Sequence, residues 1–427
     1  MVVGEISMKR DVYVIGAYQT EFKKWPEKTY KDLTREAYLG VLNDIGWKNG
    51  DEIQSGWFGN VFMGALWGQA SIRGQVCMNP LVKEKLFPER VPIINVEGAC
   101  GSGGMAFSGA WKDILSGQAE VSFAIGVEKL FNPDKTSEDM FRAFQKCMDY
   151  FNPEEWIKIY EDAARKVGKE FKMGKDRTVF MDTYAAQAAY HMNKYGTTQR
   201  QIAAAASKSH HNGTLNPSAQ YRFEVSIEQV LQDREVNFPV TRSMCAPMGD
   251  GAAAAILCSG DYLKNLPSVV QNRAVKIMGI GMAGGKHRDL DEPGVTKFAG
   301  ERAYKMAGVG PADIDFAEVH DAVAFSDIYE AEMLGFCPEG AGGKLAESGE
   351  TSLEGRIPLN TSGGLVSKGH PLGATGLSMA YELVTQLRGE AGLRQVKNAL
   401  IGLFDNGGGS MGLDDAVCIV AILQKDR

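Results

Sequence analysis

The sequence predicts an α/β protein with a layered core of two similar halves and a helical segment inserted between them. Two glycine-rich segments each open an amphipathic helix that is followed by a short apolar strand. The first begins at Cys100 and leads to a strand at 121–127, and the second spans 362–376 and leads to a strand at 399–404. Because strands alternate with helices, we expect α/β layers with mostly parallel sheets.

Each half begins with an apolar strand that ends in glycine, at residues 12–16 and 275–279. In both predicted helices the apolar residues recur three or four positions apart, so they share one helical face. A tight turn at 249–251 feeds a strand of small apolar residues at 252–258, which returns the chain to the first half. The residues of the two apolar faces are Phe107, Trp111, Ile114 and Leu115 in the first helix, and Leu377, Ala380, Tyr381, Val384 and Leu387 in the second.

The segment at 131–240 differs from both halves because it is helical and rich in aromatic and charged residues. One helix is predicted over 183–195, and the polar run at 197–200 is typical of the start of the next. We therefore divide the chain into a first half, an inserted loop domain and a second half. Their ranges are 1–130 plus 241–267, 131–240, and 268–427.

Composition excludes several classes of protein. The net charge of −7 argues against nucleic acid or an anionic membrane surface as the main partner. We find no signal peptide and no stretch near the ~20 apolar residues of a membrane span. The seven cysteines are widely spaced without a CxxC pair, which fits a reduced cytoplasmic protein. The six histidines form neither HxxxH nor HExxH, so we predict no metal.

Cys100 is the candidate nucleophile. It lies in EGACGS at 97–102, where a strand is expected to end and a helix to begin. The positive end of the helix dipole favours a thiolate, and the small neighbours leave room for a ligand. Free cysteines are more often small buried hydrophobic residues, so the candidacy depends on this strand-to-helix turn.

Two histidines are candidate partners of Cys100. His370 lies in the loop KGHPLG at 368–373, directly before the second helix, where it could act as a base or an oxyanion donor. His320 follows an expected strand, and strand ends commonly form sites in α/β proteins. Taken singly, a surface-loop histidine and a satisfied core histidine are the ordinary alternatives.

Two glycine-rich segments remain. The run that begins with Asp405, Asn406 and Gly407 follows a strand, and its backbone N–H groups could bind an anion or oxyanion, although a flexible turn is the alternative. Residues 279–284 match GxGxxG, but a dinucleotide fold needs a helix to start at once. Loop-forming residues and Pro293 follow instead, so we reject an NAD site.

Together these segments resemble the thiolase superfamily, in the same order, along nearly the whole chain. CGS at 100–102 resembles the nucleophile CxS motif, and GHP at 369–371 resembles the motif of that name. HD at 320–321 resembles the start of the HDCF motif of sterol-carrier-protein-x-type thiolases. Residues 208–217 and the run at 249–254 resemble the central segment and the DGAAA stretch of that type.

The resemblance implies a thiolase fold with α/β/α/β/α layers and acyl transfer through a Cys100 acyl-enzyme. A 3-oxoacyl-CoA would be cleaved by free CoA, or formed in the reverse Claisen condensation. His370 would take the proton of Cys100, and both His320 and His370 would hydrogen-bond the enolate oxygen. The backbone N–H groups of Cys100 and Gly407 would hold the tetrahedral oxyanion. Coenzyme A is then a co-substrate, and no permanently bound cofactor is expected.

The sequence departs from the family in lacking a second reactive cysteine. Many thiolases carry it in a CxG motif near the C-terminus, where this chain reads Asp405-Asn406-Gly407. In the HDCF motif its place is taken by Ala322. The group that exchanges a proton with the α-carbon therefore stays open among His320, Asp405 and a bound water. Asn406 is a further oxyanion or acid–base candidate.

The inserted segment suggests how the substrate binds. The basic stretch at 165–177 could meet the CoA phosphates, although its interleaved acids are also typical of a solvated helix face. Aromatic residues crowd 141–160 and could line a pocket for a bulky or aromatic acyl group, or simply pack the insertion and its dimer contact. The CoA candidates in the basic stretch are Lys172, Lys175 and Arg177.

The resemblance also suggests a substrate and partners. The chain is similar to the thiolase subunits that cleave 2-benzoylsuccinyl-CoA, and it implies a homodimer or dimer of dimers. A partner with a zinc ribbon and an OB fold is expected, as in related archaeal thiolases. An acetoacetyl-CoA-type condensing thiolase and a ketoacyl synthase are alternatives within the superfamily. A catalytically silent scaffold or lipid-binding subunit is favoured only by the missing second cysteine.

Overall fold

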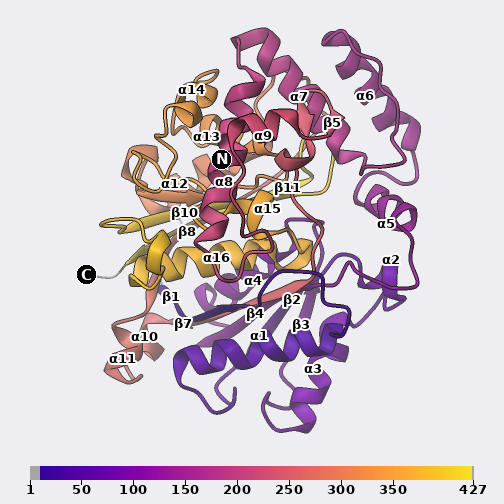
Figure 1. The fold of residues 1–427 in the computed structure, drawn as a ribbon. Helices are drawn as coiled ribbons and strands as arrows, with labels where there is room; N and C mark the ends of the chain where they lie inside the picture. The colour runs from indigo at the N-terminus through magenta and orange to yellow at the C-terminus, as the bar shows by residue number, and fades with distance from the viewer. Residues whose placement is uncertain (1–9, 426–427) are drawn as a thin grey trace, which may run out of the picture.

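A nine-stranded mixed sheet runs through residues 10–425, the part of the chain that this computed structural model describes (Figure 1). Its strand order is β3-β2-β4-β7-β1-β8-β11-β10-β9, and β5 and β6 form a separate pair. The strands are β1 (Val12–Gln19), β2 (Ser55–Gly59), β3 (Ile93–Val96), β4 (Val121–Glu128), β5 (Glu235–Asn237), β6 (Val240–Thr241), β7 (Gly251–Ser259), β8 (Val275–Gly284), β9 (Phe316–Glu318), β10 (Ile401–Gly408) and β11 (Val417–Lys425).

The expectation of mostly parallel sheets is wrong. Only β2–β3, β2–β4 and β9–β10 are parallel pairs, and the other five neighbouring pairs are antiparallel. The reason is topological. The connection from β10 to β11 is too short for the crossover helix that parallel pairing needs, and β1 runs antiparallel to both β7 and β8.

The layers are those that the sequence predicts. Helices α4 (Ser102–Leu115) and α16 (Leu372–Arg388) lie between the two halves of the sheet and contact strands of both. Helices α1 (Tyr30–Ile45) and α3 (Arg73–Lys83) cover the outer face of the first half. Helix α12 (Val295–Ala307) covers β8 and β11 (Figure 1). The result is the α/β/α/β/α order.

The two central helices approach each other very closely at their N-termini. A Cβ atom on Gly103 would lie 2.8 Å from the backbone nitrogen of Gly376, and one on Gly376 would lie 2.2 Å from that of Gly104. Only glycine fits such a contact. The contact sets the residues just before each helix, Cys100 and His370, side by side.

The segment at 131–240 is mainly helical, as predicted. It contains α5 (Ser137–Phe144), α6 (Pro153–Lys166), α7 (Phe180–Tyr195), α8 (Gln199–Thr214) and α9 (Ile227–Gln232). Thr198 caps α8 through a reciprocal capping box with Gln201. Helices α7 and α8 pack on α13 (Ala324–Met333) of the second half. The division into ranges stays a prediction, and its residues 1–9 and 426–427 lie outside the described chain.

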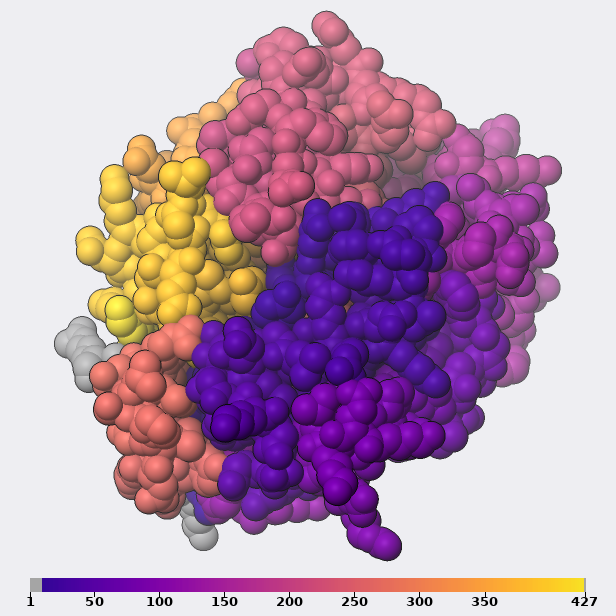
Figure 2. All heavy atoms as spheres, turned by 60° about the horizontal axis from the view of Figure 1, so that its bottom comes forward, coloured from indigo at the N-terminus to yellow at the C-terminus, as the bar shows by residue number. Residues whose placement is uncertain are grey.

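The other helices are short. They are α2 (Met63–Trp67), α10 (Gly260–Leu263), α11 (Ser268–Gln271), α14 (Gly342–Glu347) and α15 (Gly364–Lys368), with 3₁₀ turns at Gln145–Cys147, Arg242–Met244, Pro311–Asp313 and Gly392–Arg394. In the space-filling view the indigo surface of the first half is flanked by the salmon segment near α10 and α11 and by the yellow C-terminal part (Figure 2). Within residues 10–425 no helix combines the length and apolarity needed to cross a bilayer.

Candidate active site

Cys100 lies on a strained turn between β3 and α4. Ala99, directly before it, has a φ of 47°, a left-handed conformation that costs a non-glycine residue of the order of 1–3 kcal/mol. Ser102 stabilises the turn, since its Oγ accepts the N–H of Gly98 at 3.0 Å and donates to the carbonyl of Ala99 at 2.7 Å. Held in this way, the sulfur lies on the wall of a cavity instead of in the core.

His370 contacts the sulfur directly. Its Nε2 lies 3.2 Å from Sγ of Cys100, and its Nδ1 lies 2.8 Å from Oγ1 of Thr375. The Thr375 hydroxyl donates to the carbonyl of Pro371 at 3.1 Å, so it accepts from Nδ1–H of His370. The proton on Nδ1 leaves Nε2 unprotonated and facing the thiol. This is the arrangement of a nucleophile and its base.

His320 is oriented by Asn406. The N–H of Gly104 donates to Oδ1 of Asn406 at 3.0 Å, which fixes the orientation of the amide. Its Nδ2 therefore donates to the carbonyl of Cys100 at 3.0 Å and to Nδ1 of His320 at 3.3 Å. With Nδ1 as acceptor, the proton of the neutral imidazole is on Nε2, available as a donor. Asn406 thus links the nucleophile turn to the second histidine.

A largely apolar cavity surrounds these groups. Besides Cys100, His320 and His370 it is lined mostly by apolar side chains and by glycines. Its other lining residues are Phe144, Thr178, Phe180, Met181, Tyr184, Ala246, Pro247, Met248, Ala322, Leu372, Gly408, Gly409 and Asp415. The three residues chosen from the sequence as catalytic therefore lie together, and Ala322 lines the cavity beside them.

The stretch expected as a glycine-rich loop is part of a strand. β10 continues through Gly408 because its residues pair with β11, Gly407 opposite Cys418 and Gly408 opposite Val417. The glycine beside Cys100 is Gly408, where a Cβ atom would lie 2.9 Å from the nitrogen of Cys100. Gly407 does not line the cavity, and a Cβ there would collide with Oδ2 of Asp415 at 2.0 Å. The structure therefore places Gly408, and not Gly407, beside the nucleophile candidate.

Asp405 lies behind His320 instead of in the cavity. It is fully buried, and its Oδ1 accepts the backbone N–H of His320 at 2.6 Å. Its Oδ2 accepts from the hydroxyl of Thr296 at 3.5 Å. Burial raises its pKa to about 7. Asp405 therefore supports the strand end that carries His320.

Burial keeps the reacting groups neutral. It raises the pKa of the Cys100 thiol well above its usual value and lowers that of His370 well below it. It also lowers the pKa of His320 to about 4. The helix N-terminus was expected to favour a thiolate, but desolvation acts in the opposite direction. Both groups are therefore neutral before a substrate binds.

The predicted CoA-binding residues lie in the loop before α7. Lys172 and Lys175 are exposed, and Lys172 pairs with Glu170 at 2.8 Å. Arg177 is bound to Asp182 at 2.8 Å and to the carbonyl of Lys172 at 3.0 Å. The loop leads directly to Thr178, which lines the Cys100 cavity. Arg177 is thus occupied within the protein, whereas the two lysines have their ammonium groups in solvent.

Most of the aromatic residues considered as an acyl pocket pack elsewhere. Of that set only Phe144 lines the cavity, where it stands 4.8 Å from Phe62 between ring centroids. Trp156 and Tyr160 belong to a separate cluster, and Phe151 is exposed. The cavity takes its other rings from α7, through Phe180 and Tyr184. The sequence reasoning missed Phe180, and it noted Tyr184 only as part of a helix face.

Several further residues escaped the sequence reasoning. Thr375 and Asp415 belong to the site through contacts that only the fold creates. The one signal for Asp415 was an acidic pair, Asp414-Asp415, directly before a fully apolar strand. Cys147 packs in the same small apolar cluster as Cys100, and burial raises its thiol pKa strongly. It is a second cysteine near the nucleophile, in neither of the expected places.

The cysteine and both histidines also form a set that could hold a metal ion. One ligand atom from each of Cys100, His320 and His370 lies within 4.8 Å of the others. Thiolate and imidazole are ligands that suit Zn²⁺. The absence of a metal therefore stays a prediction from the sequence.

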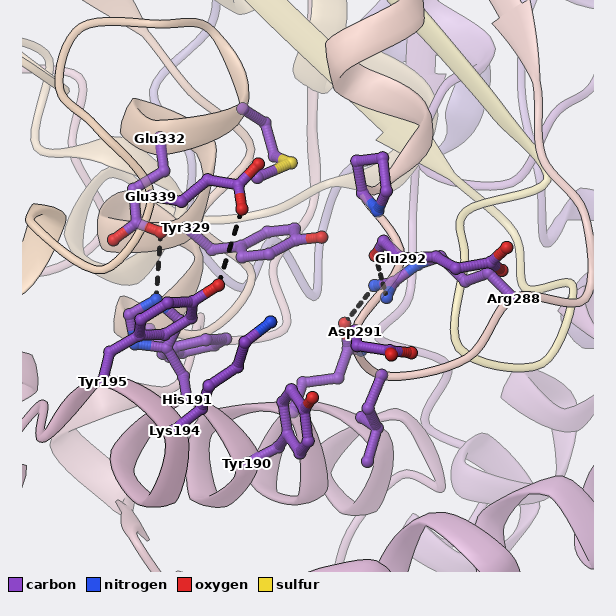
Figure 3. Close-up of a pocket in the computed structure, with 15 residues that line it drawn as sticks. Tyr190, His191, Lys194, Tyr195, Arg288, Asp291, Glu292, Tyr329, Glu332 and Glu339 are labelled. Carbon is purple, nitrogen blue, oxygen red and sulfur yellow. Dashed lines mark hydrogen bonds and ion pairs between the residues drawn. The ribbon is translucent and has the colours of Figure 1, made fainter.

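A second, more polar cavity lies between α7, residues 288–293 and α13 (Figure 3). Nε2 of the buried His191 hydrogen-bonds to Glu332 at 3.0 Å, and Arg288 donates to the carbonyls of Asp289 and Glu292 at 3.1 Å each. Arg288 also lines a smaller adjoining cavity together with Asp415. Asp415 therefore stands between the Cys100 cavity and a polar interior.

Comparison with known proteins agrees with this geometry. Residues 12–241 match the family described as Thiolase, N-terminal domain, and residues 283–422 match Thiolase C-terminal domain-like. An acetyl-CoA acetyltransferase of Methanothermobacter thermautotrophicus is 36% identical, over 94% of this chain and 97% of its own. Sterol carrier protein 2 of Oryctolagus cuniculus is 32% identical, over 92% of this chain and 69% of its own. The solved structure of the Ltp2-ChsH2(DUF35) aldolase matches with a TM-score of 0.75 at 20% identity, over 98% of each chain.

Proposed function

We propose, from the premise that this chain belongs to the thiolase family and is an acyl-CoA acyltransferase, that it cleaves a 3-oxoacyl-CoA with free CoA through an acyl-Cys100 intermediate. The observation that carries the proposal is the 3.2 Å contact between Sγ of Cys100 and the unprotonated Nε2 of His370. The reverse Claisen condensation uses the same groups, and metabolite levels set the direction.

The first step is attack of Cys100 on the 3-keto carbon. His370 takes the thiol proton as the sulfur–carbon bond forms, because the dry cavity holds neither group charged beforehand. The backbone N–H groups of Cys100 and Gly408 are the proposed donors to the developing oxyanion. Loss of one such donor typically costs about 10²–10³ in rate.

The second step breaks the bond between the α- and β-carbons. The electron pair of that bond forms the enolate of the shorter CoA ester, and its thioester oxygen needs hydrogen-bond donors. The Nε2–H of His320, set by Asn406, is one proposed donor. Free CoA then attacks the acyl-enzyme and regenerates Cys100.

The cavity suits a bulky or aromatic acyl group. Phe144, Phe180, Met181 and Met248 supply an apolar wall that would desolvate such a group. We propose 2-benzoylsuccinyl-CoA as a substrate on this ground and on the sequence resemblance. A relative named acetyl-CoA acetyltransferase favours acetoacetyl-CoA as the competing substrate. We propose that Lys172 and Lys175, the two exposed lysines in the loop that leads to Thr178, bind the CoA phosphates. Arg177 is proposed only to support this loop.

The proposed assembly is a homodimer or dimer of dimers in the cytoplasm. All seven cysteines are free, which fits a reducing compartment. The edge strand β3 is only half buried and has one unpaired side, and such an edge favours pairing with a second copy. A similar solved structure pairs Ltp2 with ChsH2(DUF35), which supports a small partner with a zinc ribbon and an OB fold.

The test is product analysis. The purified protein, alone and with its candidate partner, is incubated with free CoA and either 2-benzoylsuccinyl-CoA, acetoacetyl-CoA or a longer 3-oxoacyl-CoA. We expect shorter CoA esters by mass spectrometry and an acyl adduct on Cys100 that Cys100→Ser abolishes. Turnover only with acyl-carrier substrates would indicate a ketoacyl synthase. A silent protein with an unreactive Cys100 would indicate a scaffold or lipid-binding subunit.

A further inference from the structure

We infer that Asp415 is the catalytic acid that protonates the α-carbon of the departing enolate, and the base that removes that proton in condensation. The inference rests on the proposed function and fills the role that the missing second cysteine leaves open. Among residues 10–425, Asp415 is the only residue with a carboxyl side chain that lines the Cys100 cavity.

The fold makes room for this carboxyl group and gives it no other task. Its Oδ2 lies 2.0 Å from where a Cβ atom on Gly407 would be, so the glycine leaves room for the carboxyl group. Asp414, its neighbour in sequence, accepts the N–H of Val295 at 2.9 Å and lies 3.4 Å from Nε of Arg288. In the described part of the chain, no donor hydrogen-bonds to the carboxyl group of Asp415. A carboxyl group without a protein partner is free to act on a ligand.

The other candidates for this step are occupied or chemically unsuited. His320 is neutral, with a pKa near 4, and its Nε2–H is directed to the enolate oxygen. Asp405 is bound to the backbone of His320 and lies outside the cavity. Burial raises the phenol pKa of Tyr184 well above 10, so it is a poor acid at neutral pH.

The protonation state of Asp415 fits the proposed role. Burial and the neighbouring Asp414 and Asp405 raise its pKa to about 8. The carboxyl group is then mostly protonated at neutral pH, yet close enough to neutrality to give and take a proton. General acids and bases are most effective when their pKa lies near the working pH.

Asp415 also lines a second, small cavity, which we propose as a route for proton exchange that avoids the substrate. It lines the small cavity that contains Glu330, Arg288 and Tyr329. Arg288 and Tyr329 in turn line the polar cavity between α7 and α13 (Figure 3). Asp415 therefore lines both the Cys100 cavity and the small cavity that adjoins the polar one between α7 and α13.

The protons balance over the cycle. The thiol proton of Cys100 moves to His370, the carbon–carbon bond breaks, and the proton of Asp415 forms the new C–H bond. When the CoA thiol attacks the acyl-enzyme, its proton restores Asp415. The departing thiolate of Cys100 recovers its own proton from His370. No oxidant, reductant or further reactant is needed.

The experiment separates carbon–carbon cleavage from acyl transfer. Using the 3-oxoacyl-CoA that the wild type cleaves best in the panel above, cleavage is measured in wild type, Asp415→Asn and the neighbouring control Asp414→Asn. Two partial reactions are measured with the product esters. One is exchange of labelled CoA into the acyl-CoA, which needs Cys100; here no carbon–carbon bond breaks, so Asp415 stays protonated and His370 carries the proton between the two thiols. The other is exchange of α-hydrogens in D₂O.

We expect Asp415→Asn to lose cleavage and α-hydrogen exchange by about 10²–10⁴ while CoA exchange stays within a few-fold of wild type. Retained CoA exchange shows that the variant is folded. Asp414→Asn should cleave within a few-fold of wild type. Cleavage by Asp415→Asn near the wild-type rate would overturn the inference alone. A wild type that shows neither cleavage nor CoA exchange would overturn the proposed function as well.

Discussion

The two sides of the Cys100 cavity are built in opposite ways. On the side formed by the two halves, hydrogen bonds fix each reacting group: Thr375 holds His370, and Asn406 holds both His320 and the turn at Cys100. On the side formed by the inserted segment, the walls are apolar side chains of α5 and α7. The chemistry is thus set by polar geometry, and the choice of acyl group is left to shape.

This difference predicts different kinds of loss when each side is altered. Polar contacts in a buried site are few and directional, so removing one leaves a partner unsatisfied. Apolar contacts are many and individually weak, so a change there is spread over neighbouring atoms. Variants on the first side should therefore lose rate with every substrate. Variants on the second side should change the ratio between substrates.

The largest effect is expected for His370→Gln. Glutamine retains a hydrogen-bonding group but cannot take the proton of Cys100, and loss of a general base costs about 10²–10⁴ in rate. Thiolysis of every 3-oxoacyl-CoA should fall together, and so should labelling of Cys100 by iodoacetamide. His211→Gln, at an exposed position on α8, is the matched control. Loss with one substrate only would contradict the proposed role.

Asn406→Asp should come next. Aspartate still accepts the N–H of Gly104, but it cannot donate to the carbonyl of Cys100 or to Nδ1 of His320. An unsatisfied buried acceptor costs about 1–3 kcal/mol, which should appear as a lower free energy of unfolding in urea and as slower thiolysis. Asn43→Asp, exposed on α1, serves as the control. An unchanged unfolding curve would show that the amide does not join the two halves.

The polar side was partly predictable because its key residues mark the ends of elements. Cys100 precedes α4, and His370 precedes α16, so the glycine-rich helix starts in the sequence identified both. His320 follows β9 in the same way. That the three would meet was implied by the family resemblance. Their spacing alone did not show it, because the contact depends on the glycine-to-glycine approach of two helices.

The rest depends on the pairing of β10 with β11. Asp405, Asn406 and Gly407 look like a loop because glycine and asparagine are typical of turns. Here the glycine is needed for close approach to Asp415, and antiparallel pairing with β11 keeps the stretch extended. The same pairing brings Asp415 to the cavity. No short sequence motif predicts the position of Asp415, because the pairing register depends on the whole sheet.

The pH dependence offers an intermediate effect, with the same sign in the two directions. Asp415, with a pKa of about 8, is protonated below that pH, so thiolysis should fall about tenfold per unit above it. Condensation should fall in the same range, because its starting state, with Asp415 ionised and His370 protonated, holds the same number of protons. The lowered pKa of His370 puts any acidic limb below pH 6.5.

Groups that interact electrostatically with Asp415 are Cys100, Tyr160, Tyr184, Arg288, Glu330, Asp405, Asp414 and Cys418. Rate profiles of wild type and Asp415→Asn provide the check, since the variant should lose the fall above pH 8.

The smallest effect is expected on the apolar side, with Phe144→Leu. The ring of Phe144 packs against Phe62 at 4.8 Å and edge-on against Phe180 at 6.4 Å, and it lines the cavity. Leucine keeps the site apolar but removes ring contacts worth about 0.5–1.5 kcal/mol. The kcat/KM for 2-benzoylsuccinyl-CoA should therefore fall a few-fold to about tenfold relative to acetoacetyl-CoA. Phe171→Leu, which alters a ring packed on Tyr160 outside the cavity, should leave that ratio unchanged. An equal loss with both substrates would mean that this wall acts on the chemistry, and the contrast between the two sides would fail.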